Sequence, residues 1–109
     1  MWADDKGVQD FLAFRKSYYP ESDPNNRLAA DGYALAQGML YYLQKAGDNL
    51  TRENIMNQAA SMHDVEFPLL MPDIKVSTSP TNYRGFNQMK LVKFDGKQWV
   101  PFGEVISER

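Results

Sequence analysis

The sequence contains no cysteine and a single histidine, His63. The absence of cysteine excludes disulfides and thiolate metal sites. One histidine cannot form a cluster of imidazole ligands, and near the end of a helix it suits a C-terminal cap favoured by the helix dipole. We therefore expect no cofactor and no metal, and we interpret His63 as a helix cap in preference to a ligand or a base.

Long apolar runs and an excess of basic residues are also missing. No stretch of about 18 apolar residues is present, so no membrane span is expected. The first residues, "MWADDKGVQDF", lack the basic-then-apolar pattern of a signal peptide. The chain carries 12 basic and 14 acidic residues, for a net charge of −2. Phosphate binding needs a basic surface, so nucleic acid is not expected as a main partner.

Groupings typical of catalysis are lacking as well. Asp4 and Asp5 are adjacent, and adjacent side chains point apart, so a helix N-cap is their expected use. Gly32 and Gly38 do not form a phosphate-binding motif. Because no set of nucleophile, base or metal ligands stands out, we do not expect an enzyme.

The 109 residues, 43% of them hydrophobic, are typical of one small soluble domain, and their first half predicts three helices. The first lies within residues 7–20 and ends before Pro20. The second runs from about Leu28 to Ala46, with Gly47 as its C-terminal cap. The third lies within residues 50–64; Thr51 is its expected N-cap, and it turns Ile55, Ala59 and Met62 to the core.

The second predicted helix is apolar nearly all the way round. Between Tyr33 and Ala46 only Gln37, Gln44 and Lys45 are clearly polar, whereas a surface helix normally keeps one polar face. We expect it to be buried on more than one side, with its tyrosines in the core. A sheet with its neighbouring elements, or a tightly packed helical oligomer, would both provide such cover. The apolar positions form two stripes, Leu35, Met39 and Leu43 in one and Ala36, Leu40 and Tyr41 in the other.

The second half predicts an extended segment followed by a hairpin. Three prolines interrupt residues 67–86, which leaves at most a short strand over Ile74 to Thr78. Asp95-Gly96 lies between two strand-like runs, Met89 to Phe94 and Lys97 to Phe102, and predicts a two-residue type I′ turn. Helices first and a hairpin last indicate an α+β chain when it is considered on its own.

Three blocks in this order resemble a known family. They are "GVQDFLAFRKSYYPESDPNN", "GYALAQGMLYYLQKAGDNLTRENIMNQAASMHD" and "LMPDIKVSTSPTNYRGFNQMKLVKFDGKQWVPFGEVI", with "AGDNLTREN" and "FDGKQWVPFGEVI" the most specific parts. The chain resembles the C-terminal part of bacterial ABC-transporter substrate-binding proteins of the branched-chain amino acid type. These are also called extracellular ligand-binding receptors, or type I periplasmic binding proteins.

The resemblance implies an α/β protein with two lobes, three crossovers between them and a ligand in the cleft. Residues 1–85 would then be the last helices and crossover segment of the first lobe, with the final crossover near Tyr83 to Phe86. Residues 86–109 would be the closing hairpin and tail of the second lobe. The chain would be a single incomplete unit that lacks the front of the protein and its signal peptide. The whole protein would be periplasmic or extracellular.

The implied function is capture of an amino acid or a related small carboxylate or amide for an ABC permease. In this family the loop that leads into the second helix approaches the cleft, and here it reads "RLAADGY". The implied ligand contacts are therefore Leu28, Ala30 and Asp31. Asp31 stands at a position where members of this family often carry an aromatic residue, and we favour its interpretation as the helix N-cap. The alternative function is a truncated structural module that binds no solute and forms a homo-oligomer.

Overall fold

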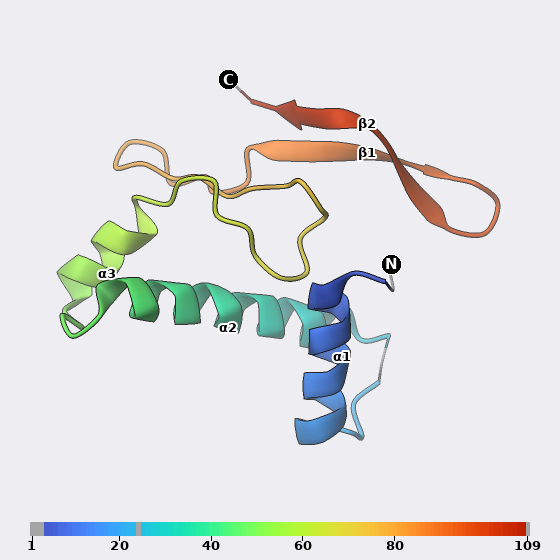
Figure 1. The fold of residues 1–109 in the computed structure, drawn as a ribbon, viewed down its shortest axis with the longest axis horizontal. Coiled ribbons are helices and arrows are strands. Elements are labelled where there is room, and N and C mark those ends of the chain that lie inside the picture. Colours follow the sequence, from blue (N-terminus) through green and yellow to red (C-terminus); the bar gives the residue numbers. More distant parts are fainter. Residues whose placement is uncertain (1–3, 24, 109) are drawn as a thin grey trace.

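The computed structural model describes residues 4–23 and 25–108. In this part of the chain, α1 (Lys6–Tyr18), α2 (Arg27–Ala46) and α3 (Arg52–Ala59) precede strands β1 (Gln88–Phe94) and β2 (Trp99–Ser107). The two strands form an antiparallel hairpin. Figure 1 shows α1 across one end of α2, α3 at the other end, and the hairpin beyond an irregular segment. The expectation of a small α+β chain is confirmed.

Helix α1, Lys6–Tyr18, agrees with the prediction except that it begins one residue earlier than the predicted range of 7–20. The Asp5 carboxylate accepts a hydrogen bond of 3.1 Å from the backbone N–H of Val8, which makes Asp5 the N-cap. The helix ends at Tyr18, before Pro20. Its apolar side packs on α2 through aromatic rings, because the rings of Phe11 and Phe14 lie 5.3 and 5.2 Å from that of Tyr33.

Helix α2 has a different N-cap from the one expected. The side chain of Asn26 accepts from the backbone N–H of Leu28 at 3.0 Å, so the helix begins at Arg27. Asp31 lies in the second turn, and its interpretation as the N-cap is wrong. The C-terminal prediction is confirmed: Gly47 ends the helix with a φ of 59°, a left-handed conformation that glycine adopts without steric cost.

Helix α3 is shorter than the sequence pattern indicates. Thr51 is its N-cap, as predicted, and accepts from Asn54 N–H at 3.3 Å. The helix ends at Ala59, so His63 lies beyond it and does not cap it; its Nδ1 instead lies 3.4 Å from an Asp64 carboxylate oxygen. Met62 is buried, as expected, although it lies outside the helix.

The hydroxyl of Thr78 explains why α3 stops there. It donates to the carbonyl of Ala59 at 2.7 Å and accepts from the backbone N–H of Met62 at 3.0 Å. The backbone N–H of Thr78 also donates to the carbonyl of Met62, at 2.9 Å. A residue distant in sequence therefore satisfies the end of the helix and turns the chain away.

Replacing Thr78 with valine is expected to lower the free energy of unfolding by about 1–3 kcal/mol, because it leaves two part-buried backbone groups without this partner. Urea denaturation measures the loss, and amide exchange at Met62 should become faster. Thr81→Val is the matched control, since the Thr81 hydroxyl meets only the exposed Ser79 side chain. Equal losses in the two variants would contradict the role given to Thr78.

The irregular segment holds no strand within its described residues. Val65 and Val76 form one isolated antiparallel bridge, with N–H to O distances of 2.9 and 2.8 Å. The expectation of an extended segment with at most a short strand over Ile74 to Thr78 is therefore met by a single bridge residue, Val76. Its ladder does not extend because the hydroxyls of Ser77 and Thr78, in place of backbone carbonyls, accept from Asp64 and Met62.

The hairpin turn differs from the predicted type I′ turn. Phe94 pairs with Trp99, so four residues, 95–98, make the connection and β2 starts two residues later than expected. The Asp95 carboxylate accepts from the backbone N–H groups of Lys97 and Gln98 at 2.8 and 2.9 Å. These side-chain hydrogen bonds stabilise the four-residue connection in place of the two-residue type I′ turn that the Asp-Gly pair predicts.

The Asp95 turn should depend on pH. Hydrogen bonds from the backbone of Gln98 and then Lys97 hold the pKa of Asp95 below its ordinary value of 3.8. A lowered folded pKa stabilises the turn above the ordinary value, and this stabilisation is lost as the pH falls through the folded pKa. NMR should show the Lys97 and Gln98 amides unchanged from neutral pH down to about pH 4 and shifting only below it. Shifts at neutral pH would contradict this assignment.

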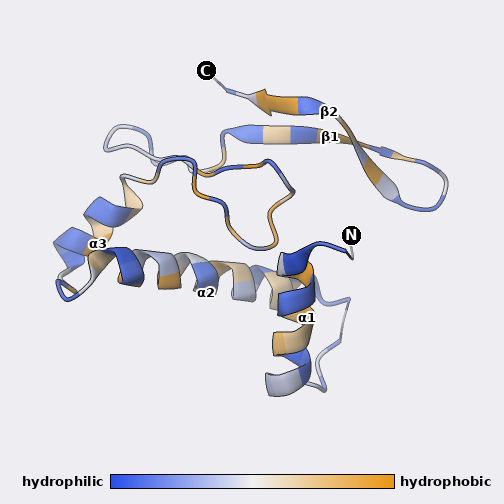
Figure 2. Ribbon diagram, in the orientation of Figure 1, coloured by the Kyte–Doolittle hydropathy of each residue, from blue (hydrophilic) through white to orange (hydrophobic). Residues whose placement is uncertain are grey.

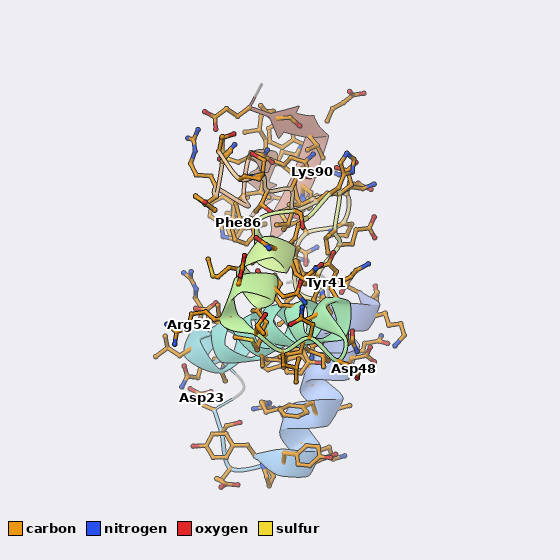
Figure 3. The ribbon with its side chains drawn as sticks, turned by 90° about the vertical axis from the view of Figure 1, so that its left-hand side faces the viewer. Asp23, Tyr41, Asp48, Arg52, Phe86 and Lys90 are labelled. Atoms are coloured by element: carbon orange, nitrogen blue, oxygen red, sulfur yellow. The ribbon has the colours of Figure 1, made fainter. Side chains whose placement is uncertain are left out.

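Little of the described chain is fully enclosed. Six apolar residues form the buried set: Val8, Phe11, Ala46, Met62, Ile74 and Val76. The molecule measures 48 × 39 × 19 Å, and its radius of gyration is 16.0 Å, against about 13 Å for a compact domain of this length. The side view shows the helices and the hairpin following one another, with Lys90 of β1 at the far end from α1 (Figure 3). The fold is thin and open.

Candidate functional site

Helix α2 has an inner face that the rest of the chain covers. Near its start, Tyr33 meets the rings of α1. Near its end, the ring of Tyr41 lies 5.5 Å from that of Phe67, edge to face, and the Lys45 ammonium lies 5.7 Å from the Tyr41 ring centroid. The expected core role of the tyrosines therefore holds for the inner-face pair Tyr33 and Tyr41.

The opposite side of α2 is apolar and uncovered, and we call it the outer face. Leu35 is 77% exposed and Met39 is 51% exposed, values typical of polar surface residues. The positions form two parallel rows with a spacing of four residues, which makes a broad face instead of a narrow seam. Its members are Leu28, Gly32, Leu35, Ala36, Met39, Leu40 and Leu43. In Figure 2 orange and pale segments recur along α2.

We expected α2 to be buried on more than one side, but its outer face is exposed in the described chain. Within the described residues, α1, α3 and the irregular segment reach only the inner face and the two ends of the helix. Both apolar stripes lie on α2, but the second is covered only in part: Tyr41 meets the Phe67 ring, whereas Ala36 and Leu40 are exposed. The stripe of Leu35, Met39 and Leu43 is exposed.

Gly32 lies on the outer face, and no contact within the described chain requires a glycine at this position. A Cβ atom added there would meet nothing within 4 Å. Glycine in a helix interior costs about 1 kcal/mol relative to alanine. No contact in the described chain requires that cost, whereas a second surface in close approach to the helix would.

A second open apolar surface lies on the hairpin. The cross-strand pairs Met89–Ile106 and Leu91–Phe102 share one face, and all four residues are exposed. The other face is anchored to the irregular segment, since Lys90 Nζ lies 3.0 Å from an Asp73 carboxylate oxygen. A two-stranded hairpin is only marginally stable by itself in water, so this face also lacks the layer that would normally support it.

The three residues implied as ligand contacts lie on the first turns of α2. Leu28 is exposed, Ala30 is half-buried, and Asp31 pairs with Arg27 across one helical turn, with Nε 3.4 Å from the carboxylate oxygen. Leu28 and Asp31 are one turn apart on one side, whereas Ala30 faces elsewhere. The described residues therefore bring two of the three together, on an open surface.

Two open hollows lie elsewhere on the chain. One, of about 360 Å³, is lined by Met56, Asn57, Ala60, Ser61, Pro80 and Tyr83, and the other, of about 330 Å³, lies between the start of α1 and residues 66–74. Neither includes the three implied ligand contacts. Among residues 4–23 and 25–108, no group of three or more potential metal ligands occurs. No helix in that part of the chain has both the length and the hydrophobicity of a membrane span.

Comparison with protein-family models, with curated proteins and with solved structures finds no match to this chain. The sequence interpretation expected cover for both sides of α2 from a sheet or from other helices, and the described residues leave the outer face exposed. Gly32 lies between the exposed residues Leu28 and Leu35, and a side chain there would meet no atom of the described chain. A glycine at such a position indicates a helix face that another surface can approach closely.

Proposed function

We propose that this chain is the C-terminal part of a solute-binding component of an ABC importer. The whole protein would capture an amino acid or a related small carboxylate or amide and deliver it to a membrane permease. It would have the α/β fold of type I periplasmic binding proteins and act in the periplasm or outside the cell. The role is binding without chemistry on the ligand.

The observation that carries the proposal is the uncovered outer face of α2. A helix that lies between a sheet and its neighbouring helices is apolar on two sides. On the inner side of α2, Tyr33 and Tyr41 contact aromatic rings of α1 and of the irregular segment. The outer side is exposed, and residues 4–23 and 25–108 do not supply a layer that covers it. The resemblance of three ordered sequence blocks to the solute-binding proteins names a source for that layer, the rest of the first lobe.

The shape of the second half also supports the proposal. Residues 83–87 have no regular secondary structure and connect the helical part to the hairpin. The hairpin keeps only a few polar contacts with the rest of the chain, among them Lys75 N–H to the Gln88 side-chain oxygen at 2.7 Å. A single connecting segment and a separately exposed hairpin fit residues 1–85 in one lobe and residues 86–109 in another.

A thermal-shift panel tests solute capture. Leucine, valine and aromatic amino acids are added to the purified chain, and at least one is expected to raise the melting temperature. A ligand that binds only the folded chain adds about 2.7 kcal/mol at a hundredfold excess over Kd. Asp31→Asn should abolish the shift, whereas Asp48→Asn, which changes another exposed aspartate, should keep it. A flat response to the whole panel would contradict solute capture by this chain.

The second candidate is a self-associating structural module, and a specific observation favours it. The accessible surface is 8502 Å², against about 6,200 Å² for a compact monomer of this mass. The difference is about 2,300 Å². The exposed large apolar residues include members of α2 and of the hairpin, such as Leu35, Met39 and Phe102. Exposed apolar surface of this extent drives association.

A further inference from the structure

The outer face of α2 has a size and a pattern that select one occupant. We infer that a second copy of this chain covers it, with the two α2 helices antiparallel about a two-fold axis that passes between Leu35 and Ala36. This inference rests on the self-association candidate and concerns the present chain, without the rest of the first lobe, which would cover the same face.

The area of the exposed surface agrees with a homodimer. A stable interface of standard size removes about 800 Å² from each partner, and obligate homodimers remove about 1,000–2,500 Å² from each. The accessible surface of the whole chain exceeds that of a compact monomer by about 2,300 Å², so an interface of standard size would bury less than this excess. The bulky apolar side chains of the outer face are all exposed and available to such a contact: Leu28, Leu35, Met39, Leu40 and Leu43.

The order of large and small residues fits an antiparallel pair. With the two-fold axis between Leu35 and Ala36, Leu35 lies opposite Ala36 of the second copy, and Met39 lies opposite its Gly32. Leu28 then lies opposite Leu43 at either end. In the same register Leu40 lies opposite Asp31. Leu35 and Met39, nearest the axis, each face a small residue, which allows the helix backbones to approach closely there. A parallel pair would instead place Gly32 against Gly32 and Met39 against Met39.

Charge is distributed as an interface requires. From Gly32 to Leu43, α2 carries no charged residue. Arg27 and Lys45 lie at the two ends of the face, at the rim. Asp31 lies opposite Leu40 and keeps Arg27 as its ion-pair partner, at 3.4 Å. The antiparallel arrangement also brings the positive end of each helix dipole near the negative end of the other.

Substitution tests whether this face is the one used. Leu35→Glu enters a two-fold interface twice and is expected to weaken dimerisation at least ~30-fold, the effect of an interface hot spot. Its fold should be unchanged by circular dichroism, because Leu35 is exposed in the single chain. Leu91→Glu, on the exposed hairpin face, is the matched control and should leave the dimer intact. Sedimentation velocity over a concentration series measures both.

Cysteine cross-linking tests the antiparallel arrangement, and the native chain has no cysteine to interfere. Leu35→Cys lies next to the axis and should link to its own counterpart on oxidation. Leu28→Cys or Leu43→Cys alone should not, because about 22 Å of helix then separates the two thiols. A mixture of the Leu28→Cys and Leu43→Cys chains should give a mixed disulfide-linked dimer.

Each other outcome overturns the inference. A monomer at all concentrations would exclude the second copy and the self-association candidate together. A dimer lost in Leu91→Glu but kept in Leu35→Glu would leave self-association standing and assign it to the hairpin. Self-linking of Leu28→Cys and of Leu43→Cys chains would show a parallel pair. None of these results changes the thermal-shift test of solute capture.

Discussion

Phe11→Ala is expected to lower the free energy of unfolding by about 3–5 kcal/mol, the cost typical of truncating a buried phenylalanine. The Phe11 side chain is 6% exposed, and its ring joins α1 to Tyr33 of α2. Small domains have a net stability of about 5–15 kcal/mol, so the variant should have little stability left. Chemical denaturation followed by circular dichroism, at one protein concentration, measures the change.

Phe14→Ala is the matched control for Phe11. Phe14 belongs to the same helix and meets the same Tyr33 ring, at 5.2 Å, but it is 48% exposed. Its loss should cost clearly less, because much of its surface already lies in water. Equal losses for the two variants would contradict the described packing of α1 on α2.

Met62→Ala is expected to cost about 2–5 kcal/mol. Met62 is 5% exposed, and its backbone N–H and carbonyl are both bound by Thr78. Removing the side chain leaves a cavity where the end of α3 meets the irregular segment, and the bound backbone limits how far the site can collapse.

Met56→Ala provides the comparison for Met62. Met56 lies on α3 and is 56% exposed, so its truncation should change the free energy of unfolding by less than about 1 kcal/mol. Urea denaturation of both variants gives the difference. A cost for Met56 as large as that for Met62 would show that the outward side of α3 is covered in solution by something outside this chain.

Local capping chemistry made most helix boundaries predictable. Thr51, Gly47 and Pro20 act through their own backbone neighbours, so their effect can be read from a short stretch of sequence. The N-cap of α2 was missed because Asn26 and Asp31 both suit that position, and only the observed start at Arg27 separates them. The end of α3 was missed because Thr78, distant in the sequence, determines it.

The candidate site was predictable in composition but not in exposure. Periodicity identified Leu35, Met39 and Leu43 as one apolar stripe of a helix. Whether a stripe is buried depends on which elements reach it, and that is a property of tertiary arrangement which periodicity does not contain. The hairpin shows the same limit: the Asp-Gly pair located the turn, but the Asp95 side-chain hydrogen bonds determined its length.

The most direct test of the account is the solution mass of the purified chain, by size exclusion with light scattering. The chain has a mass of 12.5 kDa, and we expect a particle of twice that mass, because the outer face of α2 needs cover that the chain itself does not supply. A monomer that unfolds cooperatively and does not associate at any concentration would contradict the account, since the chain would then cover its own helix.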